Sequence, residues 1–146
     1  MIAEKALIVK DSAVILPGNL DFETAAALPN PLIGADAALM YKSGFKKGDT
    51  VLINGATGVS GKLAVQVAKH LGAAVVIATG RNAATLEQLK TLGADEIISL
   101  HQTDEAIISQ LKQAHKHTPV DVVLDYLWSH PMNLYLQLLK LYRRVK

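Results

Sequence analysis

The sequence predicts an α/β fold, a doubly wound parallel sheet with helices on both of its faces. From Val51 onward, short apolar runs rich in β-branched residues alternate with amphipathic helical segments. This alternation is typical of parallel strands joined by right-handed helical crossovers. Gly55, Gly58 and Gly61 also follow the first of these strands, as in a tight strand–turn–helix unit. The strand order expected across such a sheet is 3-2-1-4.

The elements are expected in a simple order along the chain. Glu4–Lys10 is predicted as a strand, Ala13–Leu16 as a second short extended run, Asp21 as the cap of a short helix, and Pro31–Tyr41 as a longer helix. Four strands follow at Thr50–Asn54, Ala74–Ala78, Glu96–Leu100 and Val120–Leu124. Helices are predicted from Val59 to Leu71, from Ala83 to Leu92, from Thr103 into His115–His117, and from Pro131 to Leu141.

The glycine turn between the first strand and its helix indicates an anion site. The first turn of a helix has N–H groups without internal partners, and the helix dipole adds partial positive charge there. Glycine lets a phosphate approach the backbone, so the pattern is related to the dinucleotide fingerprint of Rossmann folds. The alternative is that the glycines serve packing alone. A P-loop is excluded, because Ala56 and Leu63 stand where that motif needs Gly and Ser or Thr.

The end of the second strand indicates which dinucleotide would bind. An acidic residue about 20 positions beyond the glycines would hold the ribose hydroxyls of NAD(H), whereas an Arg would accept the 2′-phosphate of NADP(H). That position is Arg81, flanked by Thr79 and Asn82, with no carboxylate nearby. Forked, charge-assisted hydrogen bonds from Arg81 favour NADP(H) over NAD(H). The alternative is that Arg81 is an ordinary surface cation.

The composition limits the other function classes. With 146 residues, half of them hydrophobic, the chain has the length of one domain and can form a sizeable core. A net charge of +2 gives no reason to expect nucleic acid as a partner. No apolar run is long enough to cross a membrane, and the first residues do not form a secretory signal. The expected location is therefore cytoplasmic.

Neither a metal site nor a catalytic residue is predicted. The chain has no cysteine, and His115 and His117 point to different sides of a helix, so zinc is not expected. Tyr41 and Lys42 are adjacent and lack the spacing of a proton-donor pair on a helix. Tyr126 and Trp128 are expected either to stack on the nicotinamide or simply to pack.

Several segments together resemble a known family. They are Val51–Gly61, Ala64–Lys69, Leu71–Ala73, Leu92–Asp95, the upstream Ala25–Pro29 and the downstream Val120–Asp125. In this order they resemble the medium-chain dehydrogenase/reductase superfamily, and most of all its zinc-independent quinone oxidoreductase-like branch. The resemblance implies a Rossmann domain that binds NADP(H) and hydride transfer to a small-molecule carbonyl, quinone or enone.

The resemblance also implies positions for the cofactor. The residues expected against the pyrophosphate are Gly55, Ala56, Thr57, Gly58, Val59, Ser60 and Gly61. Those expected around the adenosine ribose and its phosphate are Thr79, Gly80, Arg81 and Asn82. Leu100 replaces a Tyr that members of the family often have near the adenine, and the stretch from Asp125 and Tyr126 to Trp128 is expected on the nicotinamide side.

The resemblance covers only part of a family member. Residues 1–20 are expected to be a short β segment left from a catalytic domain, and residues 21–146 a partial NADP(H)-binding Rossmann domain. The resemblance therefore leads us to expect an excised or truncated form of a family member. An alternative function is a dinucleotide-binding or interaction module without turnover of its own. If the fourth strand is the last, its open edge at Val122–Leu124 predicts a homo-oligomer.

Overall fold

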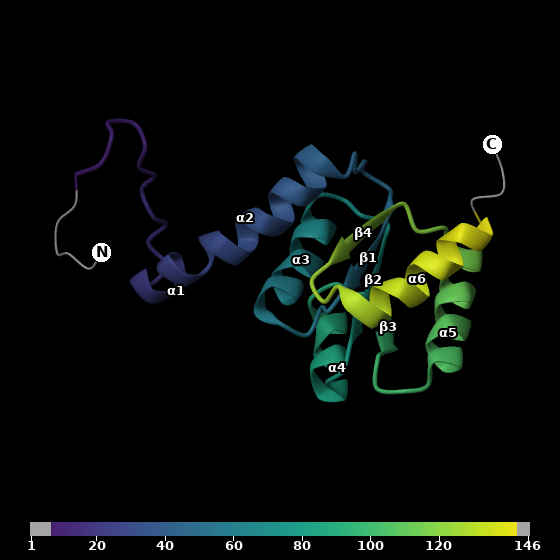
Figure 1. The fold of residues 1–146 in the computed structure, drawn as a ribbon. Coiled ribbons are helices and arrows are strands. Elements are labelled where there is room, and N and C mark those ends of the chain that lie inside the picture. Colours follow the sequence, from purple (N-terminus) through teal and green to yellow (C-terminus); the bar gives the residue numbers. More distant parts are fainter. Residues whose placement is uncertain (1–6, 143–146) are drawn as a thin grey trace.

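Four parallel strands form the centre of this computed structural model, which describes residues 7–142 (Figure 1). The strands are β1 (Thr50–Asn54), β2 (Val75–Gly80), β3 (Glu96–Ser99) and β4 (Val122–Asp125). Their order across the sheet is β3-β2-β1-β4, which confirms the predicted order. All strand pairs are parallel, and the order in which strands are added to the sheet reverses at β1, so the carboxyl ends of β1, β2 and β4 meet around the glycine turn.

The apolar side chains of β1 explain its central position. All five residues of this strand are buried, and Val51 pairs with Val76 of β2 on one side and with Val122 of β4 on the other. Successive side chains of a strand point to opposite faces of a sheet. Val51 and Ile53 accordingly lie in one apolar cluster, and Leu52 lies in the other.

Helices cover both faces of the sheet (Figure 1). The cluster around Val51 contains side chains of α2 (Pro29–Ala37), α3 (Val59–His70) and α4 (Ala83–Thr91). The cluster around Leu52 contains side chains of α5 (Asp104–His117) and α6 (Ser129–Tyr142). The predicted doubly wound α/β architecture is therefore confirmed. Among the described residues, no helix combines the length and apolar character needed to cross a membrane.

The ends of the helices follow from local sequence signals. Asp21, Asn82 and Thr103 each accept a hydrogen bond from a backbone N–H in the first turn of the helix that they precede. Gly72 and Gly93 follow α3 and α4 with φ angles of +93° and +113°, a backbone conformation that glycine adopts without strain. These residues therefore determine where α1, α4 and α5 begin and where α3 and α4 end.

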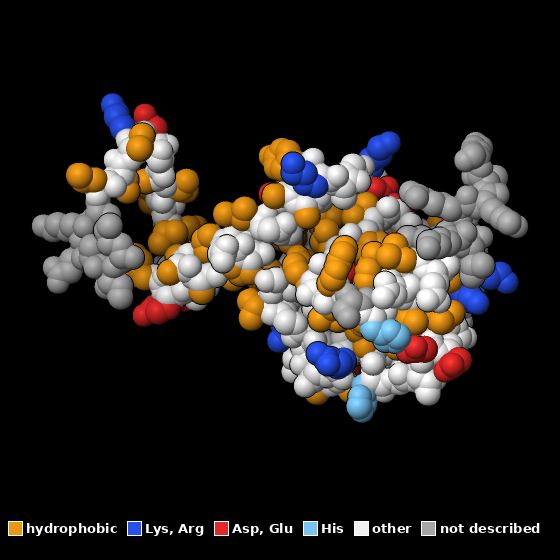
Figure 2. Space-filling view, in the orientation of Figure 1, with side chains coloured by type: hydrophobic (Ala, Val, Ile, Leu, Met, Phe, Trp, Pro, Cys, Tyr) orange, Lys and Arg blue, Asp and Glu red, His pale blue; other side chains and the backbone are white. Residues whose placement is uncertain are grey.

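The N-terminal arm, residues 7–28, extends away from the sheet and ends in α1 (Phe22–Ala27) (Figure 1). The prediction of strands here was wrong for the described residues 7–10 and for Ala13–Leu16, which form no strand, while residues 4–6 lie outside the described part. A strand needs a partner for its backbone groups, and none of the described strands lies beside the arm. Leu7, Val14 and Ile15 are almost fully exposed, among the hydrophobic side chains that Figure 2 shows along the arm.

The helix after α1 differs from its predicted bounds. It begins at Pro29 rather than Pro31, because a proline in the first turn of a helix lacks only an N–H that would have no helical partner. Past Ala37 the helix widens into a π-helical turn, η1 (Ala38–Lys42), in which the Ser43 N–H donates to the Ala38 carbonyl. The helix packs along α3 and so belongs to the body of the domain.

Candidate functional site

The turn from β1 into α3 contains two glycines, Gly55 and Gly61, that no other residue replaces without strain. Gly55 has a φ of +86°, and a Cβ there would lie 2.7 Å from Cγ of Leu127. A Cβ on Gly61 would lie 2.5 Å from Cα of Ala56 and 2.6 Å from the carbonyl oxygen of Gly55. The first turn of α3 therefore lies directly against the end of β1, as the glycine spacing predicts.

Gly58 differs from the other two glycines because it faces open space. Its backbone is extended, with φ −81° and ψ 172°, and a Cβ there would meet nothing within 4 Å. Gly58 precedes α3 and gives it no side-chain cap, in contrast to the caps of α1, α4 and α5. The N–H groups of the first turn of α3 thus face an accessible space with the positive end of the helix dipole behind them. This arrangement suits a phosphate.

A buried polar network lies under the turn. The Thr79 hydroxyl donates to Oδ1 of Asn54 at 2.7 Å, and Nδ2 of Asn54 donates to Oδ1 of Asp125 at 2.7 Å. The Thr79 carbonyl accepts hydrogen bonds from the N–H groups of Gly55 and Ala56 at 3.1 and 2.8 Å. Side chains and backbone of β2 and β4 thereby hold the turn that follows β1.

Asp125 also shapes the loop that follows β4. Its Oδ1 accepts hydrogen bonds from the N–H groups of Leu127 and Trp128 at 3.0 and 3.1 Å. Trp128 has a φ of 54°, which is uncommon for a bulky residue. The Oδ2 atom of Asp125 is buried and has no hydrogen-bond partner among the described residues. The loop is therefore fixed by the same carboxylate that joins the network under the turn.

Two pockets open at the carboxyl end of the sheet. The first, of about 430 Å³, is lined by Gly55, Thr57, Gly58, Val59, Ser60, Gly61, Tyr126 and Leu127. The second, of about 360 Å³, is lined by Arg81, Leu100, Leu127, Trp128, His130 and Pro131. Since Leu127 lines both, the pockets adjoin, and together they extend from the glycine turn to the ends of β2 and β3.

Most of the predicted site residues line these pockets, and the others support them. Ala56 is fully buried, and Gly80 allows the close approach of Thr57, whose Cγ2 would lie 2.4 Å from a Cβ at that position. The hydroxyl of Thr79, expected to donate to a ribose phosphate, is instead directed to Asn54 inside the domain. The oxygen of the Asn82 side chain caps α4, so only its amide N–H groups remain to donate outward.

The predicted site set lacks part of the pocket lining. His130 and Pro131 were not predicted, and they line the second pocket because the loop after β4 returns over the ends of the strands. Leu127 and Trp128 were expected on the nicotinamide side, but Leu127 lines both pockets and Trp128 lines the second pocket together with Arg81. The sequence signal for this loop is its position directly after a strand of the parallel sheet, because ligands bind at the carboxyl ends of such strands.

The charges in the second pocket are unevenly paired. Arg81 is exposed and forms no ion pair within the described part of the chain, whereas Nε2 of His130 lies 2.9 Å from Oδ1 of Asp104. In the first pocket, burial disfavours the charged form of Tyr126 and raises the pKa of its hydroxyl above the usual value of 10.0. Residues 7–142 contain no cluster of three or more His, Asp or Glu that could hold a metal ion.

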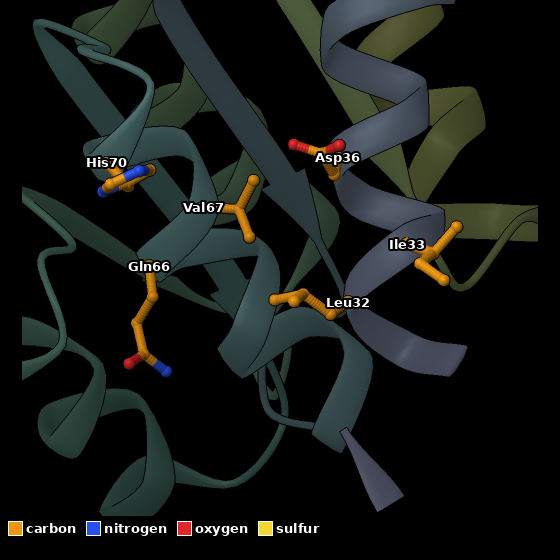
Figure 3. Close-up of a pocket in the computed structure, with 6 residues that line it drawn as sticks. All are labelled: Leu32, Ile33, Asp36, Gln66, Val67 and His70. Atoms are coloured by element: carbon orange, nitrogen blue, oxygen red, sulfur yellow. The ribbon is translucent and has the colours of Figure 1, made fainter. Parts of the chain in front are cut away.

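A separate pocket of about 310 Å³ lies between α2 and α3 (Figure 3). It is lined by Leu32, Ile33, Asp36, Gln66, Val67 and His70. None of the glycines or the residues after β2 and β4 contributes to it, so it is distinct from the site at the carboxyl end of the sheet.

Comparisons with known proteins agree with this geometry. The family model described as zinc-binding dehydrogenase matches residues 60–145. Quinone oxidoreductase of Sus scrofa is 32% identical over 125 residues, which are 86% of this chain and 37% of that protein. The chain thus spans little more than a third of the length of this relative.

Solved structures of dehydrogenases and oxidoreductases also resemble this chain. An NAD-dependent alcohol dehydrogenase, 31% identical, superposes with a TM-score of 0.74 over 83% of this chain and 34% of its own. Escherichia coli quinone oxidoreductase complexed with NADPH, 30% identical, superposes with a TM-score of 0.67 over 77% of this chain and 33% of its own. The chain therefore belongs to the zinc-binding dehydrogenase family, and it corresponds to the cofactor-binding region of quinone oxidoreductase-like medium-chain dehydrogenases/reductases.

Proposed function

We propose that the chain is the NADP(H)-binding domain of an oxidoreductase that transfers hydride to a small carbonyl, quinone or enone. The observation that carries this proposal is the uncapped start of α3, where Gly58 opens onto a pocket at the carboxyl end of the sheet. A pyrophosphate placed there would accept hydrogen bonds from the first-turn N–H groups. The relatives named above are oxidoreductases, which supports the same reaction class.

Arg81 supports NADP(H) as the cofactor. It lies directly after β2 in the second pocket, and no carboxylate lines that pocket to repel a 2′-phosphate. The two solved structures above do not decide this choice, since one is named as NAD-dependent and the other contains NADPH. The preference therefore depends on the guanidinium of Arg81 and its forked hydrogen bonds.

The chemistry of hydride transfer would come from the nicotinamide, while the protein binds and orients it. Tyr126 and Leu127 line the first pocket beyond the glycine turn and would limit the access of water to the reacting ring. No residue of this chain is proposed as a proton donor.

Although the family name refers to zinc, the residues described here do not form a zinc-binding set, and we propose that this chain uses no zinc.

A second candidate function is a dinucleotide-binding module without turnover of its own. It is favoured by the lining of the pocket around the glycine turn, in which no residue is proposed as a proton donor. We further propose a cytoplasmic location and a homo-oligomeric state, the latter because β4 forms one edge of the described sheet.

Calorimetric titration with NADPH and NADH tests the proposal. We expect NADPH to bind more tightly, and Arg81→Ala to weaken NADPH by about tenfold to hundredfold while NADH changes little. Lys112→Ala, which removes an exposed cation of α5 outside both pockets, is the matched control. If neither cofactor binds at millimolar concentration, the proposed function is wrong. Equal binding of both would reject only the preference for NADP(H).

Turnover assays separate the two candidate functions. Consumption of NADPH by this chain with a panel of quinones and enones would reject the module without turnover. Binding of NADPH without any consumption would support that module.

A further inference from the structure

Trp128 combines two features that a bulky side chain rarely has together. Its backbone φ is 54°, and its side chain is 75% exposed. In this left-handed region the Cβ of an L-residue crowds its own carbonyl group, so the conformation is disfavoured for any residue but glycine. Burial of the indole does not explain the conformation, because most of the ring remains in contact with solvent.

The strained backbone is held in place by the network under the glycine turn. Oδ1 of Asp125 accepts a hydrogen bond from the Trp128 N–H at 3.1 Å and another from Nδ2 of Asn54 at 2.7 Å. Since Asn54 is buried at the end of β1, the position of Trp128 is tied to the centre of the sheet rather than left to a free loop.

The indole lines a pocket whose other walls are apolar or cationic. Leu100 comes from the end of β3, Pro131 from the start of α6 and Arg81 from the end of β2. His130 also lines this pocket, but its Nε2 is paired with the Asp104 carboxylate at 2.9 Å. Arg81 is therefore the cation left for a ligand, beside an exposed aromatic face.

We propose that Trp128 is the stacking surface for the adenine ring of a 2′-phosphorylated adenosine, with the phosphate on Arg81. A flat base matches an indole and an apolar floor, and its phosphate matches a guanidinium at the edge of the same pocket. The inference rests on the proposed function, and it assigns Trp128 to the adenosine half rather than the nicotinamide half of the dinucleotide. It also implies that the left-handed backbone of Trp128 lowers the free energy of unfolding, and that this conformation is kept because it presents the indole to the ligand.

The chain itself provides the probe, because Trp128 is its only tryptophan. Adenosine 2′,5′-bisphosphate carries the base and the 2′-phosphate without a nicotinamide, whereas nicotinamide mononucleotide carries the other half. We expect the bisphosphate to quench the tryptophan emission in a saturable manner, with the midpoint that calorimetry gives for its binding. Nicotinamide mononucleotide should leave the emission unchanged.

Variants at this position separate stacking from strain. Trp128→Ala and Trp128→Gly both remove the ring and should weaken the bisphosphate by about tenfold to hundredfold, while Trp128→Phe retains most of the affinity. Only glycine relieves the left-handed backbone, so Trp128→Gly should melt at a higher temperature than Trp128→Ala. Both melting curves also show whether each variant is folded.

The results distinguish this inference from the proposed function. If NADPH binds but the bisphosphate does not bind, does not quench, or binds Trp128→Ala within twofold of the original chain, the stacking role is wrong and the proposed function stands. Quenching by nicotinamide mononucleotide alone would move Trp128 to the other half of the dinucleotide and also reject the inference. If neither NADPH nor the bisphosphate binds, the proposed function fails together with the inference.

Discussion

The hydroxyl of Thr79 donates a hydrogen bond to Oδ1 of Asn54 at 2.7 Å, and both side chains are almost fully buried. Thr79 lies near the end of β2 and Asn54 at the end of β1, so the bond joins two neighbouring strands beneath the glycine turn. Nδ2 of Asn54 continues to Asp125 at the end of β4. The floor of the candidate site is therefore a unit held by side chains as well as by the strand ladder.

Replacing Thr79 with valine tests this unit. The change keeps the shape of the side chain but removes the hydroxyl, which leaves Oδ1 of Asn54 buried without that donor. We expect the free energy of unfolding to fall by about 1–3 kcal/mol, as urea denaturation would measure. Thr79→Ser retains the hydroxyl and should keep the hydrogen bond. A loss of stability in Thr79→Ser without a loss in Thr79→Val would mean that packing of the methyl group, rather than the hydrogen bond, stabilises the site.

The sheet could be predicted because its signals are local and repeated. Each strand is a short apolar run next to an amphipathic helix, and this alternation admits few topologies. The glycine turn was predictable for the same reason, since Gly55 and Gly61 are required by the backbone conformation and the close packing that the structure shows there. The residues directly after β1, β2 and β4 were therefore placed correctly at the carboxyl end of the sheet.

The direction of individual side chains at the strand ends could not be predicted in the same way. Thr79 and Arg81 are two residues apart, yet one turns inward to Asn54 and the other lines the second pocket. The course of the loop after β4 depends on Asp125 accepting two backbone hydrogen bonds, a tertiary detail without a sequence period. Residues 7–16 have strand-forming composition but no partner strand within the described chain, so composition alone was misleading there.

The cap of α1 makes a pH dependence testable. Hydrogen bonds from the N–H and the hydroxyl of Thr24, both at 2.7 Å, lower the pKa of Asp21 below its usual value of 3.8. A lowered pKa in the folded state means that the ionised cap stabilises α1 above about pH 4, and that this contribution is lost as the pH falls through the lower pKa. Carbon-13 NMR of the carboxyl carbons should show this titration, together with fraying of α1.

Asp21→Asn is the control for the cap. It keeps an oxygen that accepts from the Thr24 N–H but removes the titration, so the acid-induced fraying should disappear. A carboxyl of Asp21 that titrates at or above 3.8 would contradict the cap as the structure shows it.

Self-association follows from the edge position of β4. The backbone groups on the outer side of Val122–Asp125 have no strand beside them within the described sheet. We expect light scattering to give a mass above the 15.6 kDa of one chain as the concentration rises. A chain without residues 1–28 separates this edge from the exposed apolar arm, because only association through the arm would be lost. A single-chain mass at every concentration would reject both routes.

Two glycines of the turn should separate folding from binding. Gly61→Ala places a Cβ 2.5 Å from Cα of Ala56, a backbone atom that cannot move aside, so we expect a loss of about 1–3 kcal/mol in stability. Gly58→Ala places its Cβ in open space with an allowed backbone conformation, so the fold should change little. The same methyl group would stand where a pyrophosphate approaches α3, and calorimetry should show weaker NADPH binding. If a folded Gly58→Ala variant binds NADPH as tightly as the original chain, the pyrophosphate does not bind in front of Gly58.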